Sequence, residues 1–386
     1  MSATFVIAGD LCAAGRIGSA LSTSTTSLLW SDIRLITEAA DFAVVNVECP
    51  LTDRPEPIFK SGPGLWGPAR SALGIRSAGF TAASLANNHI LDAGPAGLLQ
   101  TLQTCHDAGL MCVGAGATHA LATRPLTATI GDMRLSVLAF AENEFSTTSG
   151  PHPGAWPLDL VDNAMQIAQA RHSSDFVLVL LHGGAEHYPL PSPRMQKRCR
   201  FFVEMGADAV ICHHTHVVSG YEFYKDRPIV YGIGNLLFDC PDEETDGWLT
   251  GCIVRIHASH QSAPELELVP YRQDPAIPSV RLMIGHERDT FLSNLSELNS
   301  TIADYERLSV SWSAFCRTQK ADFLASMLCL TRPEAWLLDH ELLPTARVRF
   351  TRRSLARLQN LFSCESHSES CERLLRDMLE EMSPHG

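Results

Sequence analysis

The chain has 386 residues, of which 45% are hydrophobic and 19% charged, and its formal net charge is −13. This composition supplies enough apolar side chains for a folded core and excludes an intrinsically disordered chain. The acidic balance argues against nucleic acid as a partner, because binding to phosphates needs a positive surface. The longest apolar runs, such as Phe176 to Leu181, have the length of a strand, so we expect no membrane span.

The N-terminal sequence MSATFVIAGD contains neither a basic segment nor a long apolar stretch. We therefore expect no secretory signal and a cytoplasmic protein. The twelve cysteines are scattered, and none forms a C-x-x-C pair. We interpret them as buried, reduced thiols in preference to ligands of a structural zinc.

The first 270 residues alternate short β-rich runs with helical patterns, which is typical of an α/β layer fold. The predicted strands, in chain order, are Thr4–Ala8, Phe42–Val47, Thr81–Leu85, Leu126–Ile130, Arg134–Phe140, Phe176–Leu181, Ala207–Cys212, Ile229–Tyr231, Gly251–Ile256 and Leu266–Val269. The predicted helices among them are Asp32–Ala40, Ala96–Ala108, Leu158–Arg171 and Pro193–Met205. Glycines such as Gly109 and Gly206 follow directly where two of these helices should end.

After about residue 273 the strand signals fade and long amphipathic stretches follow. These stretches are Asp289–Leu308, Val310–Leu328 and Arg352–Met382. We therefore predict two domains, an α/β domain over residues 1–272 and a helical C-terminal extension over residues 273–386.

Five predicted strands end in residue types that bind metals or transfer protons. These residues are Asp10, Asn46 and Glu48, Asn88 and His89, His182, and the histidines of the segment His213-His214-Thr215-His216. Because the carboxyl ends of strands in α/β folds converge on one crevice, we expect the side chains to share a site. This set of nitrogen and oxygen ligands suits Mn, Fe or Zn, as one ion or two.

Each signal also has a simpler interpretation. A lone aspartate such as Asp10 is common in turns, and Asn87-Asn88-His89 is compatible with a helix cap. Three histidines within four residues, in contrast, are hard to explain by core packing. His214 and His216 are two residues apart, so on an extended segment they point the same way.

The chain resembles the CapA/PgsA family over about residues 4–272. The motifs that carry the resemblance are GD at 9–10, NVE at 46–48, LANNHILDAG at 85–94, LLHGGAEHY at 180–188, CHHTHVVSGYEFY at 212–224 and GNLLFD at 234–239. That family is associated with capsule and poly-γ-glutamate synthesis and is built on the calcineurin-like metallophosphatase fold. The resemblance implies a four-layer α/β/β/α sandwich with its site at one end of the two sheets.

The resemblance also implies roles for individual residues. The implied metal ligands are Asp10, Glu48, Asn88, His182, His214 and His216. His89 corresponds to the histidine that touches the reacting oxygen, and Lys60, Asn46 and Glu186 are expected to contact the substrate. The metallophosphatase sequence Asp-x-His reads Asp10-Leu11-Cys12 here, so one imidazole is missing, and the number of bound divalent ions is left open between two and none.

We expect an enzyme that hydrolyses a peptide-like, γ-glutamyl or phosphoester substrate with metal assistance, its partner being a peptide or a small anion. An alternative is a metal-independent peptide epimerase of the lasso-peptide type, which would invert a Cα centre with Asp10 and His286 on opposite faces. His286 is equally typical of a surface histidine at a helix start. A third possibility is a non-catalytic factor in capsule or polymer assembly.

Overall fold

The computed structural model describes residues 2–23, 27–239, 245–319, 332–339, 358–362, 367–368, 370–371 and 374–375. The chain divides into two compact units, Met1–Ser313 and Ala314–Gly386. The predicted domain boundary at residue 272 stays a prediction. Most of the predicted stretch Arg352–Met382, and residues 320–328 of the stretch before it, lie outside the described residues. Within the part of the chain that is described, no helix is both long and apolar enough to cross a bilayer.

The first sheet has eight strands in the order β16-β15-β14-β1-β2-β3-β4, and β13 lies beside β1. Strands β1 to β4 run parallel, whereas β14 to β16 run antiparallel. All residues of β2 are buried, as expected for a strand that is covered on both faces. The strands are β1 (Ser2–Leu11), β2 (Phe42–Val47), β3 (Ala82–Ser84), β4 (Met111–Val113), β13 (Asn235–Leu237), β14 (Thr250–Ser259), β15 (Glu265–Gln273) and β16 (Val280–Leu282).

The second sheet has six strands in the order β11-β12-β10-β9-β7-β6. Its central strands β7, β9, β10 and β12 run parallel. The strands are β6 (Leu126–Ile130), β7 (Met133–Ala141), β9 (Phe176–His182), β10 (Ala209–His213), β11 (Tyr221–Tyr224) and β12 (Arg227–Val230). A small separate sheet pairs β5 (Ala115–Gly116) with β8 (Gly154–Ala155).

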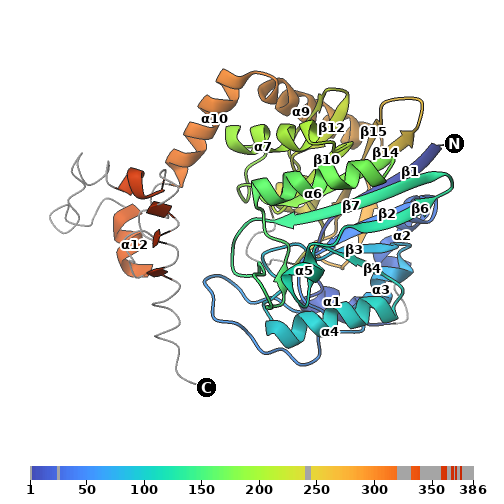
Figure 1. The fold of residues 1–386 in the computed structure, drawn as a ribbon, viewed down its shortest axis with the longest axis horizontal. Helices are drawn as coiled ribbons and strands as arrows, with labels where there is room; N and C mark the ends of the chain where they lie inside the picture. Colours follow the sequence, from blue (N-terminus) through green and yellow to red (C-terminus); the bar gives the residue numbers. More distant parts are fainter. Residues whose placement is uncertain are drawn as a thin grey trace. The chain divides into compact units, whose positions relative to one another are not determined.

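The two large sheets pack face to face, and helices cover their outer faces (Figure 1). Between the sheets, the rings of Phe5 in β1 and Phe176 in β9 meet edge to face, 5.0 Å apart. The helices on the first sheet are α1 (Gly15–Leu21), α2 (Ser27–Glu38), α3 (Ser71–Ser77) and α4 (Gly94–Asp107). Those on the second sheet are α6 (Leu160–Ser173) and α7 (Pro193–Glu204). The predicted four-layer α/β/β/α sandwich is therefore confirmed.

All ten predicted strands and all four helices predicted before residue 270 are present. The shorter elements were missed because a few residues carry too little periodicity to detect. Among them are the seven-residue helices α1 and α3 and the four-residue helices α5 (His119–Ala122) and α8 (Asp246–Leu249). The amphipathic stretch predicted over Asp289–Leu308 is helical but is divided between two helices. The chain forms α9 (Gly285–Ile302) and α10 (Tyr305–Thr318), because the Asp304 carboxylate accepts hydrogen bonds from two backbone N–H groups and starts a new helix. A further helix is α12 (Arg332–Asp339).

A close backbone approach between β1 and the segment before β13 positions the end of β1. The backbone N–H of Asp10 donates to the carbonyl oxygen of Gly234 at 3.2 Å. A Cβ atom on Gly9 would lie 2.0 Å from that same oxygen, so only glycine fits there. Gly234 itself has a φ of +70°, in the left-handed region that glycine tolerates.

We predict that Gly9→Ala destabilises the protein by about 3 kcal/mol, the upper end of the usual cost of overpacking, because the clashing atom belongs to the backbone. Chemical denaturation should show this as a lower midpoint. Gly64→Ala is the matched control, since its new Cβ would meet only the far end of the Trp66 side chain at 3.2 Å. Equal stability of the two variants would contradict the proposed close packing.

Candidate metal centre

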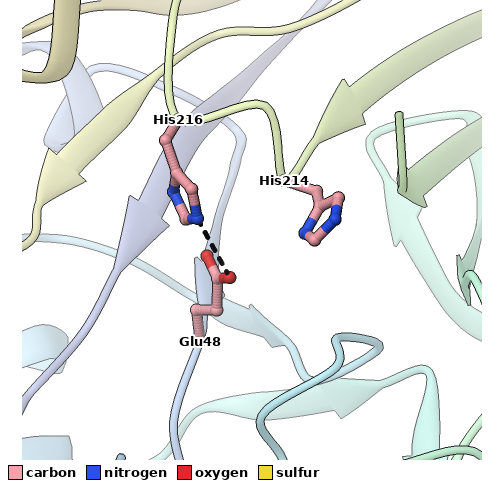
Figure 2. Close-up of side chains that lie close together, drawn as sticks. All are labelled: Glu48, His214 and His216. Atoms are coloured by element: carbon pink, nitrogen blue, oxygen red, sulfur yellow. Dashed lines mark ion pairs between the residues drawn. The ribbon is translucent and has the colours of Figure 1, made fainter. Parts of the chain in front are cut away.

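The carboxyl ends of four parallel strands bring two groups of metal-ligating side chains together. One group is Glu48, His214 and His216, and the other is Asp10, Glu48 and His182. Within each group the ligand atoms lie within 4.8 Å of one another. Figure 2 shows Glu48 directed at His216, with His214 on the same loop as His216. Glu48 belongs to both groups, so it occupies the centre of the site.

The Glu48 carboxylate is fully buried, and neither of its oxygens has a hydrogen bond within the described chain. Its neighbours are instead imidazoles, with Oε1 at 3.3 Å from Nε2 of His182 and 3.9 Å from Nε2 of His216. Burial, and next the negative charge of Asp10, raise the pKa of Glu48 well above its ordinary value. A buried carboxylate without donors is costly unless a cation compensates it, so the residues present fit a bound metal ion.

His182 is held from both sides by amides. Its Nδ1 lies 3.2 Å from the Asn46 amide nitrogen, and its Nε2 lies 3.0 Å from the amide oxygen of Asn88. The Asn46 amide also donates to Asp10 at 2.8 Å, which links the ends of β1 and β2. Burial, followed by the neighbouring imidazoles, lowers the pKa of His182 well below its ordinary value. His182 is therefore neutral near pH 7, the form in which histidine binds metals.

His214 and His216 both adopt left-handed backbone conformations, with φ values of +88° and +56°. Such conformations are strained for residues other than glycine and occur mainly where the surroundings enforce them. Here the backbone N–H of His214 donates to the Asp10 carboxylate at 3.0 Å. The Nδ1 of His216 lies 2.9 Å from the side-chain oxygen of Asn235, which leaves its Nε2 directed at Glu48. Burial lowers the pKa of His216, so this imidazole is also neutral.

His89 lies at the edge of this centre and contacts a buried aspartate. Its Nδ1 is 2.6 Å from the carboxylate of Asp92, which is 1% exposed. The same carboxylate pairs with the Lys60 ammonium at 2.6 Å and accepts the backbone N–H of Leu65 at 2.8 Å. These bonds orient the ring of His89 with Nδ1 toward Asp92 and leave Nε2 available for other partners. The Lys60 side chain is only 6% exposed and is already paired, so its expected contact with substrate stays a prediction.

Two carboxylates border the more open side of the site. Glu144 accepts the Asn88 amide at 3.0 Å and lies 3.8 Å from Nε2 of His214. Glu186 lies 3.9 Å from the same nitrogen. Their side chains are 39% and 49% exposed, in contrast to the buried Glu48. Glu186 is therefore accessible to a ligand, although its predicted contact with substrate stays a prediction.

Cys12 does not take the place of the missing imidazole. Cys12 belongs to neither ligand group of the described residues. A hydrogen bond with the Cys49 thiol, and next burial, raise the pKa of Cys12 well above its ordinary value. The side chain is therefore a neutral thiol, whereas a metal ligand would need to be a thiolate.

The predicted pairing of His286 with Asp10 stays a prediction. His286 is exposed in the first turn of α9, which follows the edge strand β16. Strand β16 is three positions from β1 in the sheet, or about 14 Å at the usual strand spacing. Leu282 of β16 pairs with Tyr271, and Tyr271 pairs with Gly251 of β14. No hydrogen bond or ion pair between His286 and Asp10 is present among the described residues, so the two-base arrangement of an epimerase stays a prediction.

Three residues of the site were not predicted from the sequence. Asp92 and Asn235 lie inside the motifs LANNHILDAG and GNLLFD, so their positions there were a usable signal. Each acts by orienting a histidine, which only the spatial contact reveals. Glu144 follows β7 in a segment without any motif, and nothing in the sequence pointed to it.

Comparison with known proteins shows matches over most of this region. Residues 4–240 match the family model described as bacterial capsule synthesis protein PGA_cap. A capsule biosynthesis protein CapA of Bacillus anthracis is 29% identical over 205 residues, which cover 51% of this chain and 48% of that protein. The PGA biosynthesis protein CapA of Bacillus subtilis (strain 168) is 26% identical over 294 residues, 72% of this chain and 73% of that protein.

Among solved structures, the 5'-nucleotidase of Candida albicans SC5314 is similar with 12% identity and a TM-score of 0.39. That match covers 82% of this chain and 57% of the nucleotidase. The chain spans about half the length of the Bacillus anthracis relative.

We predict that Glu48→Gln stabilises the metal-free protein in a pH-dependent way. Because the folded-state pKa of Glu48 is raised, the folded wild type retains a proton that the unfolded chain releases above its ordinary pKa of 4.5. The free energy of unfolding of the wild type therefore falls as pH rises from that value toward the folded-state pKa. The variant lacks this loss and should be more stable by about 1–3 kcal/mol near pH 8, with little difference near pH 4.

Thermal unfolding in the presence of a chelator measures this difference. Glu265→Gln, at an exposed position of β15, is the control for removing a negative charge. A metal-free Glu48→Gln protein that is less stable than the wild type at the higher pH would show that Glu48 is not an uncompensated charge.

Proposed function

The chain belongs to the bacterial capsule synthesis protein PGA_cap family, and on that premise we propose that it is a metal-assisted hydrolase of a peptide-like, γ-glutamyl or phosphoester substrate. The observation that carries the proposal is the buried Glu48 carboxylate, which has no hydrogen-bond donor and lies among imidazoles at the ends of the strands. A chain with only a scaffolding role has no physical need for this arrangement, since it costs stability in the absence of a cation.

The residues that would hold a divalent ion are Asp10, Glu48, His182, His214 and His216. Asn88 is a candidate for a further oxygen ligand, because its amide oxygen lies 3.0 Å from Nε2 of His182 and so borders the same site. Neutral imidazoles and carboxylates suit Mn, Fe or Zn. A bound ion supplies Lewis acidity toward the reacting oxygen and lowers the pKa of water. The low pKa values of His182 and His216 mean that little proton competition would oppose binding near neutral pH.

His89 is the residue best placed to transfer a proton. Its Nδ1 is bound to Asp92 and its Nε2 is left for the substrate, so the ring can donate a proton to the oxygen or nitrogen of the leaving group. The Asp92 carboxylate stabilises the positive charge of the protonated ring. Lys60 pairs with Asp92 at 2.6 Å and fixes the position of this carboxylate. Hydrolysis then adds the elements of water across the cleaved bond, and His89 recovers its proton from solvent.

The open side of the site favours a substrate that approaches past Glu144 and Glu186. Both carboxylates are partly exposed, and both face Nε2 of His214. They would repel an anion placed directly against them, so the negatively charged parts of a substrate must lie elsewhere. The scissile group itself, an amide or a phosphoester, would lie between His214 and His89.

We predict that the purified protein, loaded with Mn²⁺, Fe²⁺ or Zn²⁺ and then desalted, retains about one ion or more per chain. Elemental analysis measures the ratio directly and does not depend on activity. His214→Ala and His216→Ala should each lower the ratio at least about tenfold, because removing a ligand usually weakens metal binding strongly. His106→Ala, at an exposed position on α4, is the control. Fewer than about 0.1 ions per chain in the loaded wild type would contradict the metal centre.

We predict that His89→Ala lowers the turnover of the metal-loaded protein by about 10²–10⁴-fold, the usual contribution of a general acid. Asp92→Asn should lower turnover at least about tenfold, because an amide does not stabilise the protonated ring. Release of nitroaniline from a γ-glutamyl anilide and of nitrophenol from a phosphate ester measures the two substrate classes. Metal content and melting temperature should stay at wild-type values in His89→Ala. A fully active His89→Ala protein would rule out this role for His89.

A further inference from the structure

Exposed aromatic rings gather beside one stretch of the candidate site. Within the described part of Met1–Ser313, the exposed phenylalanines and tryptophans are Phe59, Trp66, Phe145 and Phe223. Three of these four, all except Phe223, lie on segments that hydrogen-bond to residues 88–92, the stretch that carries His89. Single exposed aromatics are ordinary on a protein surface, whereas several beside one site indicate a binding surface.

Phe59 is 93% exposed, more than any other large apolar side chain among the described residues. The residue before it, Ile58, donates its backbone N–H to the carbonyl oxygen of Asp92 at 3.4 Å. The residue after it, Lys60, pairs with the Asp92 carboxylate at 2.6 Å and lies 3.2 Å from Nδ1 of His89. Phe59 is therefore held beside the proton donor although its ring is left in water, where an apolar surface is unfavourable.

Trp66 belongs to a second segment that bonds to the same aspartate. The backbone N–H of Leu65 donates to the Asp92 carboxylate at 2.8 Å, and the Trp66 side chain that follows is 37% exposed. Asp92 thus anchors Lys60 and Leu65 together. Each of these two residues has an exposed aromatic side chain as its neighbour in the chain.

Phe145 belongs to a third segment, which approaches from the end of β7. Its neighbours both bond to Asn88, since the Glu144 carboxylate accepts the Asn88 amide at 3.0 Å and the Ser146 hydroxyl donates to the Asn88 carbonyl oxygen at 2.7 Å. The ring is 44% exposed, and its centroid lies 5.7 Å from the Lys60 ammonium. This is the distance of a cation–π contact, which holds the ring beside Lys60.

The rings and the exposed carboxylates border different parts of the site. Glu144 and Glu186 lie 3.8 and 3.9 Å from Nε2 of His214, whereas the three aromatic residues adjoin the stretch of His89. The charge of Lys60 is already paired. A ligand group next to His89 therefore meets mainly apolar surface, which favours apolar ligands in proportion to the area that they cover.

We propose that Phe59, Trp66 and Phe145 form an aromatic rim that binds an apolar, ring-bearing leaving group of the substrate. The inference rests on the proposed function, because His89 is there the residue that protonates the leaving group, and the group next to His89 is then the leaving group. It names the substrate class that the metal centre leaves open. The substrates are amides or phosphoesters with an apolar ring on the leaving side of the cleaved bond.

The first test is a binding measurement that needs no turnover. Fluorine NMR gives the affinity of the full-length, Zn²⁺-loaded chain for the fluorobenzyl amide and the fluoroethyl amide of acetic acid. The wild type should bind the fluorobenzyl amide at least about fivefold more tightly, because its ring buries more apolar area. This comparison requires no variant.

Phe59→Ala/Phe145→Ala should weaken binding of the fluorobenzyl amide about tenfold, and Trp66→Ala about threefold, since an aromatic contact contributes about two- to tenfold in affinity. Binding of the fluoroethyl amide should change less than about twofold. Phe223→Ala, which removes an exposed phenylalanine on the edge strand β11, is the matched control and should bind both amides like the wild type.

Equal affinity of the wild type for the two amides would overturn the aromatic rim, as would rim variants that bind the fluorobenzyl amide like the wild type. An equal loss in Phe223→Ala would overturn it too. Either result leaves the proposed hydrolysis intact. A loss confined to the rim variants supports the rim even if no substrate is cleaved, in which case the proposed function fails and the leaving-group assignment fails with it.

The second test assigns the rim to the leaving side. Benzyl phosphate and methyl phosphate release alcohols of similar acidity, so they differ chiefly in the apolar area of the leaving group. Phe59→Ala/Phe145→Ala should raise KM for benzyl phosphate about tenfold and leave KM for methyl phosphate within about twofold of wild type. An equal rise in KM for both esters would contradict the assignment.

Discussion

The burial of Glu48 is the constraint on which the rest of the site depends. A carboxylate with no donor is tolerated in a folded protein only where something else offsets its charge. Here the surrounding groups are neutral imidazoles and amides. These groups can bind a cation, but they carry no positive charge that would offset the carboxylate. The raised pKa of Glu48 and the lowered pKa of His182 therefore have the same main cause, which is burial away from water. Metal affinity and apo-state instability are linked, because the same desolvated carboxylate causes both.

Outer contacts hold the side chains of this centre in position. Asn235 orients His216, Asn46 links Asp10 to His182, and Asp92 orients His89. Each of these side chains is buried and makes at least one hydrogen bond, which restricts its movement. Rigid outer contacts matter for catalysis because small displacements of a proton donor cost large factors in rate.

Backbone geometry explains why this centre forms at the end of the two sheets. Gly9 permits the segment before β13 to approach β1 closely, and this approach places Asp10 beneath the loop of His214 and His216. Both histidines have left-handed backbones, so the fold spends conformational energy to direct them inward.

The sequence by itself determined the layer fold and the composition of the centre. Alternating strand and helix patterns extend over many residues, and Asp10, Glu48, His182, His214 and His216 follow strands whose carboxyl ends must converge in an α/β sheet. Whether Cys12 could replace an imidazole, and whether His286 could reach Asp10, depended on directions and distances between segments far apart in the chain. The same holds for Asp92, whose role is a contact with His89 and Lys60 inside one pocket. Periodicity records which face of an element is buried, but only tertiary packing decides which buried groups touch.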